Sequence, residues 1–130
     1  MVLDASAAVA WLFGAPGAAP VASRIGRSEE TVHVPHLFDL EIVNALRRAG
    51  RAGRVSSDRA LGVLADLSAL RATRYPHGPF VPRIWELREN LSAYDAAYVA
   101  LAEALDAPLL TLDERLARAP GVRARVELVR

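Results

Sequence analysis

Hydrophobic and polar positions alternate with two different periods along this chain, and together they predict short strands separated by helices. Residues 1–3 are an apolar segment that runs directly into Asp4 and then into an apolar, helix-forming run that ends at Phe13. The other predicted strands are the short segments 31–34, 73–76, 109–112 and 126–129. Strands that alternate with helices predict an α/β fold in three layers, with a short central parallel sheet of four or five strands flanked by helices.

Predicted helices fill the segments between the strands. A weak helix ends near Gly26, and stronger ones cover residues 36–49, 58–70, 80–91, 92–105 and 113–119. In the helix over 58–70, leucines recur at the spacing of a buried face, at Leu61, Leu64 and Leu67. In the helix over 80–91, the side chains expected to point inward are Ile84, Trp85, Leu87 and Leu91. No repeat or linker interrupts the pattern, so we expect a single domain over residues 1–130.

The start of the chain contains almost no charge, which raises the question of a signal peptide or a membrane span. A signal peptide has basic residues ahead of its apolar core, but no basic residue precedes Arg24. A spanning helix requires about 20 strongly apolar residues, and this stretch is interrupted at Gly14, Pro16, Gly17 and Pro20. We therefore expect neither, and no association with a membrane.

The composition is that of a globular protein, with 52% hydrophobic and 24% charged residues. The absence of cysteine excludes disulfides and thiolate metal sites, and it fits a reducing cytosol, so we expect a cytoplasmic protein. The net charge of +1 is too small to indicate a polyanionic partner by itself. The positions of the charges are more informative.

Asp4 and Asp113 share one situation, because each follows an apolar strand and precedes a helix. The carboxyl ends of parallel strands meet at one edge of a sheet, so we expect the two carboxylates to be neighbours there. Each also has a purely structural explanation. Asp4 is a favoured helix N-cap, and Thr111 with Glu114 has the spacing of a capping box in whose first turn Asp113 would add a favourable charge.

Glu41 and Asp95 lie within predicted helices, on faces that are otherwise mainly apolar. The residues one turn away from Glu41 and Asp95 include Leu37, Phe38, Leu91, Tyr98 and Val99. A carboxylate on such a face needs partners, since an unpaired buried charge is strongly unfavourable. For Asp95 the structural alternative is a capping box with Ser92.

Several carboxylates that converge in one cleft would repel one another unless a cation lies among them. Hard oxygen ligands suit Mg²⁺ or Mn²⁺, so the acids predict a divalent-metal site. Zinc is not expected, because the chain has no cysteine and its histidines, His33, His36 and His77, have no zinc-like spacing.

Four segments around these acids form a pattern of their own: Val2-Leu3-Asp4-Ala5-Ser6-Ala7, Glu41-Ile42-Val43-Asn44-Ala45-Leu46, Tyr94-Asp95-Ala96-Ala97-Tyr98-Val99-Ala100-Leu101-Ala102 and Leu110-Thr111-Leu112-Asp113. Over its whole length the chain resembles PIN-domain proteins of the VapC toxin type. The resemblance implies a metal-dependent endoribonuclease whose acidic site, with Mg²⁺ or Mn²⁺, consists of Asp4, Glu41, Asp95 and Asp113. It also implies that these carboxylates are oriented by Ser6, Asn44 and Thr111.

The same resemblance implies an RNA substrate, cleavage products with 5′-phosphate and 3′-hydroxyl ends, a small VapB-like antitoxin as partner, and a homodimer. It does not specify which RNA is cleaved. The predicted helices over 58–70 and 80–91 are candidate contact surfaces for these partners, although an amphipathic helix more often packs within its own chain.

Arginine supplies all 16 basic side chains, and two groups of them begin next to the proposed acids. One group is Arg47, Arg48, Arg51 and Arg54, and the other is Arg115, Arg118, Arg123 and Arg125. Arginine suits bidentate contacts to phosphate, so the candidate substrate-binding residues are Arg47, Arg48, Arg51 and Arg115. The alternatives are that they contact the antitoxin or are simply solvated.

Two other functions remain open from the sequence. One is a non-catalytic PIN-like module that binds RNA or protein, and the other is a metal-dependent phosphatase that acts on small phosphate esters. The complete set of four acids argues against the first, and the arginine groups argue against the second.

Overall fold

Five parallel strands form the centre of the molecule, in the spatial order β3-β2-β1-β4-β5. The computed structural model covers residues 1–130. The strands are β1 (Val2–Leu3), β2 (Val32–Pro35), β3 (Ala72–Tyr75), β4 (Leu109–Thr111) and β5 (Val126–Leu128). The predicted parallel sheet is therefore confirmed, with β1 in the middle and β5 at one edge.

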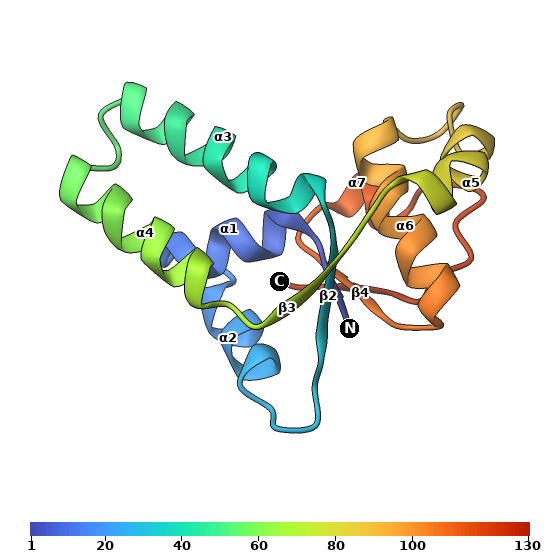
Figure 1. The fold of residues 1–130 in the computed structure, drawn as a ribbon, viewed down its shortest axis with the longest axis horizontal. Coiled ribbons are helices and arrows are strands. Elements are labelled where there is room, and N and C mark those ends of the chain that lie inside the picture. Colours follow the sequence, from blue (N-terminus) through green and yellow to red (C-terminus); the bar gives the residue numbers. More distant parts are fainter.

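Helices cover both sides of this sheet (Figure 1). On one side lie α1 (Ala5–Phe13), α2 (Ala18–Ile25), α3 (Leu37–Arg51) and α4 (Ser57–Ala69). On the other side lie α5 (Val81–Glu86), which follows a 3₁₀ turn at Gly78–Phe80, and α6 (Ala93–Leu105). The short α7 (Glu114–Ala117) comes soon after β4. The three predicted layers are therefore present, and the α3–α4 hairpin projects away from the strands (Figure 1).

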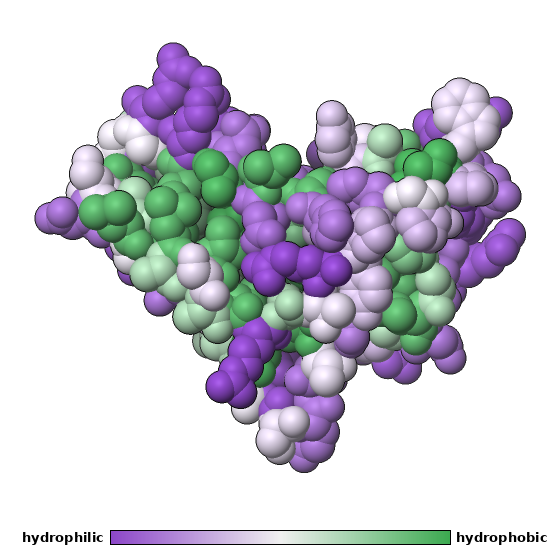
Figure 2. Space-filling model, in the orientation of Figure 1, coloured by the Kyte–Doolittle hydropathy of each residue, from purple (hydrophilic) through white to green (hydrophobic).

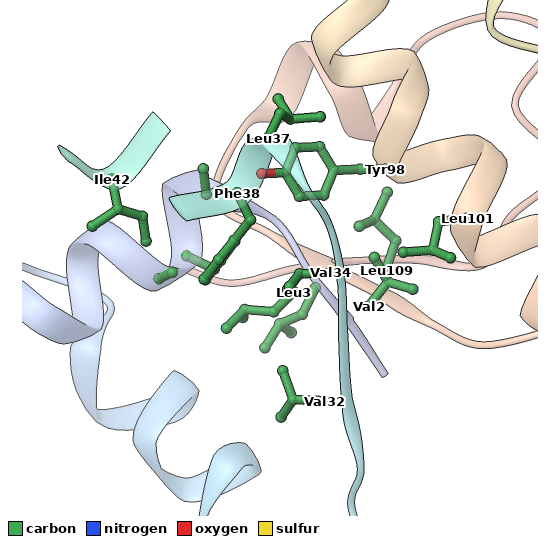
Figure 3. Packing of buried hydrophobic residues seen from close by; sticks show 14 of the residues in the cluster. Val2, Leu3, Val32, Val34, Leu37, Phe38, Ile42, Tyr98, Leu101 and Leu109 are labelled. Atoms are coloured by element: carbon green, nitrogen blue, oxygen red, sulfur yellow. The ribbon is translucent and has the colours of Figure 1, made fainter. Parts of the chain in front are cut away.

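The two residues of β1 show why this strand lies in the middle. Val2 and Leu3 are both fully buried, because a strand covered by helices on both faces needs apolar side chains in succession. Figure 3 shows Val2 near Leu101 of α6, whereas Leu3 lies on the other face of the sheet, toward Phe38 of α3. Asp4 is the first polar residue after this strand, so it emerges at the carboxyl edge of the sheet.

The buried face of α4 differs from the prediction. Val63 and Leu67 are buried, whereas Leu61 is 66% exposed and Leu64 is 36% exposed. The helix carries two apolar stripes that overlap at Leu67, and both have helical spacing. Only the stripe that faces α1 and α3 is buried, so the prediction was wrong for Leu61 and Leu64 and correct for Leu67.

The helix predicted over residues 80–91 is shorter than expected, because α5 ends at Glu86. Leu87 is buried, and Ile84 and Leu91 pack against the core as predicted. Trp85 does not point inward: it is 65% exposed, and the Arg88 guanidinium lies 4.4 Å from its ring centroid. The prediction for Trp85 was therefore wrong.

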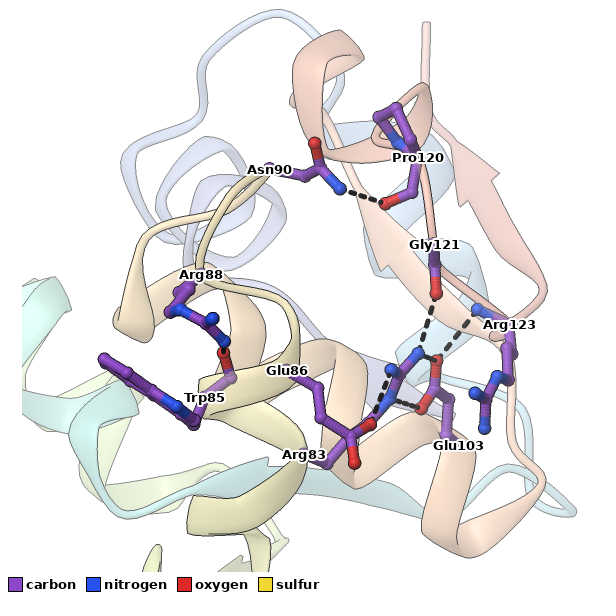
Figure 4. Close-up of polar contacts among 9 residues, drawn as sticks. All are labelled: Arg83, Trp85, Glu86, Arg88, Asn90, Glu103, Pro120, Gly121 and Arg123. Carbon is purple, nitrogen blue, oxygen red and sulfur yellow. Dashed lines mark hydrogen bonds and ion pairs between the residues drawn. The ribbon is translucent and has the colours of Figure 1, made fainter.

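An ion pair between α5 and α6 explains the orientation of Trp85. Nε and Nη2 of Arg83 donate to the two carboxylate oxygens of Glu103, at 2.8 and 3.0 Å (Figure 4). Arg83 also donates to the carbonyl of Gly121 at 2.7 Å, so this cluster anchors the chain that leads into β5. Trp85 follows Arg83 by two residues and therefore lies on roughly the opposite side of the helix, toward solvent.

No single helix is long and apolar enough to cross a membrane. The pair formed by α1 and α2 meets the length and composition criteria together, but the two helices are bent by 103° at their junction.

The two stripes of α4 give a direct test of this packing. Leu67→Ala is expected to lower the free energy of unfolding by about 2–5 kcal/mol, because it leaves a cavity in the core. Leu61→Ala is the matched control, and it should change stability by no more than about 0.5 kcal/mol, because Leu61 is exposed. Chemical denaturation of both variants measures the difference, and equal losses would contradict the observed face.

Candidate active site

The carboxylate of Asp4 lies at the junction of the two central strands. It is buried, at 5% exposure, and its Oδ2 accepts hydrogen bonds from the Thr111 hydroxyl at 2.8 Å and from the Ser6 hydroxyl. The Ser6 hydroxyl in turn accepts from the backbone N–H of Leu112 at 3.0 Å. Ser6 and Thr111 therefore hold Asp4 in place and tie the end of β1 to the end of β4.

Asp4 is also the N-cap of α1, because its Oδ2 accepts from the backbone N–H of Ser6 at 3.3 Å. The structural explanation is therefore correct, but it does not exclude a functional one. All hydrogen bonds to the Asp4 side chain go to Oδ2, and Oδ1 remains available for a ligand.

Asp113 lies at the same edge of the sheet, as predicted, because its backbone N–H donates to the Thr111 hydroxyl at 3.0 Å. The same hydroxyl donates to Asp4, so Thr111 lies between the two acids. The capping box of Thr111 with Glu114, which was the structural alternative, does not form. Asp113 itself is the N-cap of α7, and its Oδ1 accepts from the N–H groups of Arg115 and Leu116 at 2.8 and 3.4 Å.

Glu41 is held by a residue that the sequence did not single out. The hydroxyl of Tyr98, a fully buried residue of α6, donates to Oε1 of Glu41 in α3 at 2.7 Å. This bond joins helices on opposite sides of the sheet and leaves Oε2 of Glu41 free. The available signal was that a buried tyrosine usually finds a partner for its hydroxyl, and that Tyr98 follows Asp95 by three residues, about one turn.

Asp95 is partly buried in the first turn of α6. Its backbone N–H donates to the Ser92 hydroxyl at 3.2 Å, so Ser92 caps the helix as the structural explanation predicted. The carboxylate of Asp95 nevertheless lies within electrostatic reach of Asp4 and Asp113. Capping and convergence on the other acids are therefore both present.

Burial is the main reason why the pKa values of three carboxyl groups at this site are raised. It raises the pKa of Asp4, although hydrogen bonds from Ser6 and Thr111 oppose the change. It also raises the pKa of Glu41, where the Tyr98 hydroxyl opposes it and the charges of Asp4 and Asp95 add to it. The pKa of Asp95 is raised first by burial and then by Asp4 and Asp113. The negative charges of these carboxylates therefore repel one another, as expected for acids that lie close together.

Little positive charge offsets this cluster. The Arg115 guanidinium is 3.9 Å from Oδ1 of Asp113, and its charge partly opposes the rise in the pKa of Asp95. The Arg115 side chain is, however, 95% exposed. A pair this exposed contributes little free energy in water. The acidic cluster therefore lacks a buried counter-charge.

The donor set suits a hard divalent cation. Asp4, Glu41 and Asp113 each use one carboxylate oxygen for protein hydrogen bonds and leave the other free. No group of three acidic or histidine side chains stands in ligand geometry around one point. Mg²⁺ usually keeps several waters and binds only one or two carboxylates directly, rather than sitting in a closed cage of protein ligands. The open arrangement of these acids therefore suits Mg²⁺ or the similar Mn²⁺.

The other predicted site residues lie farther out. The Asn44 side chain is exposed and makes no hydrogen bond, but it lines a surface hollow together with Glu41, so its orienting role stays a prediction. The first arginine group is exposed and makes no ion pairs, and it consists of Arg47, Arg48, Arg51 and Arg54. In the second group, Arg118 pairs with Glu114 and Arg125 pairs with Glu127.

Comparisons with known proteins identify the family of this chain. The model of the PIN domain family matches residues 1–122. Ribonuclease VapC1 of Mycobacterium tuberculosis is 46% identical over 130 residues, which cover 99% of this chain and 97% of that protein. The crystal structure of PAE2754 from Pyrobaculum aerophilum has a TM-score of 0.69 at 27% identity and covers 96% of this chain and 81% of its own.

A third similar protein shows the fold alone. It is VapBC2 from Rickettsia felis, solved bound to a DNA fragment from its promoter, with a TM-score of 0.71 at 15% identity over 99% of this chain and 98% of its own. Fold, acidic edge and sequence identity together define a PIN domain, and the chain belongs to this family. Within the family it is a VapC-type protein.

Asp4→Asn is expected to make the metal-free protein more stable at neutral pH. Because burial raises the pKa of Asp4, this carboxyl favours the folded state below its ordinary pKa, and the advantage is lost as the pH rises through the raised value. Asparagine cannot ionise and caps a helix about as well as aspartate. Between acid and neutral pH the stability of the variant should therefore fall less than that of the wild type, as measured by denaturant unfolding in EDTA.

Asp58→Asn is the matched control, since Asp58 is an exposed acid in the first turn of α4. This control should keep the pH dependence of the wild type. If the Asp4→Asn curve instead ran parallel to the wild-type curve over the whole pH range, Asp4 would be only a helix cap.

Proposed function

We propose that this protein is a metal-dependent endoribonuclease, the toxin of a type II toxin–antitoxin pair, built as one PIN domain over residues 1–130. The observation that carries the proposal is the convergence of four carboxylates from β1, α3, α6 and the β4–α7 junction on one edge of the sheet, without a buried counter-charge. The relative VapC1 is named a ribonuclease, which supports RNA as the substrate.

The residues of the site would either hold a metal ion or orient the residues that hold it. Asp4, Glu41, Asp95 and Asp113 would hold Mg²⁺ or Mn²⁺, through the free oxygens of Asp4, Glu41 and Asp113 and the carboxylate of Asp95. Such a metal supplies Lewis acidity toward the phosphodiester and lowers the pKa of the attacking water. Ser6 and Thr111 orient Asp4, and Tyr98 orients Glu41. By family resemblance, the products would carry 5′-phosphate and 3′-hydroxyl ends.

The unpaired arginines of α3 would bind the RNA backbone. Arg48 follows Glu41 by seven residues, about two helical turns, so the two lie on nearly the same face of α3. Arg51 lies one turn farther along, whereas Arg47 lines a different hollow with Val43 and Leu64. Arg48 and Arg51 are therefore better placed than Arg47 to contact a strand that passes the acids, and Arg115 would contact it from the α7 side.

Asp95→Asn should abolish RNA cleavage while leaving the fold intact. The loss of a ligand should reduce activity by more than the roughly 10- to 100-fold typical of an orienting partner. The measurement is cleavage of bulk RNA and, in parallel, of a chromogenic phosphate ester, each with Mg²⁺, Mn²⁺ or EDTA. Asp58→Asn is again the matched control and should cut RNA like the wild type.

The outcomes of this experiment separate the three functions. Metal-dependent cleavage of RNA without hydrolysis of the ester supports the proposal. Hydrolysis of the ester without cleavage of RNA would identify a phosphatase, and RNA binding without any hydrolysis would identify a binding module. An Asp95→Asn variant that cuts RNA and gains the same thermal stabilisation from Mg²⁺ as the wild type would contradict the assigned site.

We also propose a homodimer that binds a small antitoxin in the cytoplasm. Both helices expected to serve as contact surfaces carry exposed apolar side chains, namely Leu61 and Leu64 on α4 and Val81 and Trp85 on α5. Val43 adds to this surface on α3, and Figure 2 shows hydrophobic surface over the α3–α4 region on the left of the view. Exposed apolar clusters of this kind are typical of protein interfaces.

Light scattering is expected to give the mass of a dimer, and co-expression with the product of an adjacent small reading frame should give a stable complex. Replacing both Leu61 and Val43 with Ser should weaken one of the two assemblies without unfolding the chain, because these side chains are 66% and 44% exposed. A monomer at high concentration together with the absence of an adjacent partner gene would contradict this proposal.

A further inference from the structure

Tyr94 is a large aromatic side chain that is left exposed directly beside the acidic site. It precedes Asp95 at the start of α6, and 66% of its surface is exposed. Tyr98, one turn later on the same helix, is fully buried against Glu41. Residues four apart lie on the same helix face, so Tyr94 stands at the rim of the cleft whose interior contains Tyr98 and Glu41.

Two hollows meet at Tyr94. One is open, measures about 460 Å³, and is lined by Tyr94 together with Leu37, Leu40, Glu41 and Asn44. The other, of about 250 Å³, is almost entirely apolar, and Tyr94 and Leu37 line it as well. The Tyr94 side chain therefore contributes to the wall between an apolar hollow and one that contains a carboxylate of the site.

The first hollow offers the chemistry that a nucleobase requires. Tyr94 supplies an aromatic face, and Leu40, which is 73% exposed, supplies an apolar surface on α3. The exposed amide of Asn44 can both donate and accept hydrogen bonds at the edge of a base. A base is neutral and flat, so it can lie beside Glu41 without the repulsion that a phosphate would meet there.

We propose that Tyr94 is the stacking platform for an unpaired base of the RNA substrate, and that it sets the position of the neighbouring phosphate at the acids. The inference rests on the proposed ribonuclease function and extends it to single-stranded RNA. Bases in a duplex are already stacked, and only an unpaired base exposes its face to an aromatic side chain. Arg48 and Arg51, on the α3 side of the hollow, would hold the backbone of the same strand.

The test compares Tyr94→Ala with Tyr94→Phe in the full-length protein. Binding of a short unstructured RNA is measured in EDTA, so that no cleavage occurs. Stacking of one base is worth about 1–3 kcal/mol, so Tyr94→Ala should bind about 5- to 150-fold more weakly, while Tyr94→Phe, which keeps the ring, should bind like the wild type. Leu105→Ala is the control, since Leu105 is an exposed apolar side chain at the other end of α6 that lines neither hollow.

Two further arms make the test specific to stacking. When the same RNA is annealed to its complement, wild type and Tyr94→Ala should bind equally. In a set of RNAs that each carry one abasic nucleotide at a different position, only one member should bind the wild type more weakly than the intact RNA does. Tyr94→Ala should bind all members of the set equally. Equal binding of unstructured RNA by Tyr94→Ala and Leu105→Ala, or no binding of it by the wild type, would contradict the proposed stacking role of Tyr94.

The outcomes also separate this inference from the proposed function. If the wild type cuts bulk RNA and Tyr94→Ala binds RNA normally, the ribonuclease function is supported and the stacking role of Tyr94 is contradicted. If the wild type binds unstructured RNA through Tyr94 but cuts no RNA with any metal, the stacking role is supported and the ribonuclease function is contradicted. Loss of antitoxin binding by Tyr94→Ala, with RNA binding unchanged, would assign Tyr94 to the protein partner and overturn the inference.

Discussion

The buried carboxylate of Asp4 at the end of the central strand is the constraint on which the rest of the site depends. A charge in this position requires hydrogen-bond donors, and Ser6 and Thr111 provide them. Thr111 also accepts from the backbone of Asp113, and Ser6 accepts from the backbone of Leu112. The hydrogen bonds that satisfy Asp4 therefore also fix the edge formed by β1 and β4, and they bring a second acid to that edge.

The distribution of ion pairs distinguishes this edge from the rest of the surface. Elsewhere, partly buried arginines pair closely with acids, as Arg83 does with Glu103 and Arg24 with Glu30. At the site, the acids receive hydrogen bonds from hydroxyl and backbone N–H groups instead, and the one guanidinium nearby is almost fully exposed. Neutral donors hold the carboxylates in position without cancelling their charge. The site therefore keeps its negative potential, at the expense of stability.

The three layers contribute different parts of the site. The sheet carries Asp4 and Asp113 at the ends of its strands, α3 brings Glu41 from one side, and α6 brings Asp95 from the other. The bond from Tyr98 to Glu41 connects the two helical layers across the carboxyl edge. The same two helices form the open hollow beside the acids, so the fold places the proposed metal ligands and an aromatic surface next to each other. This proximity is what a nuclease needs to hold a strand at its reacting phosphate.

The sequence by itself determined the succession of strands and helices and the parallel sheet, because each of these leaves a local pattern, and it pointed to four acids as candidates for a site. An apolar strand followed by a carboxylate is visible within a few residues, as at Asp4 and Asp113. Only the tertiary structure decided which of two apolar stripes on α4 is buried, and that Trp85 points outward, because periodicity describes a helix but not its neighbours. It also decided that the Tyr98 hydroxyl donates a hydrogen bond to Glu41, whereas the Asn44 side chain makes no hydrogen bond to a carboxylate. Contacts between residues 57 positions apart depend on how the layers pack, and no local spacing encodes them.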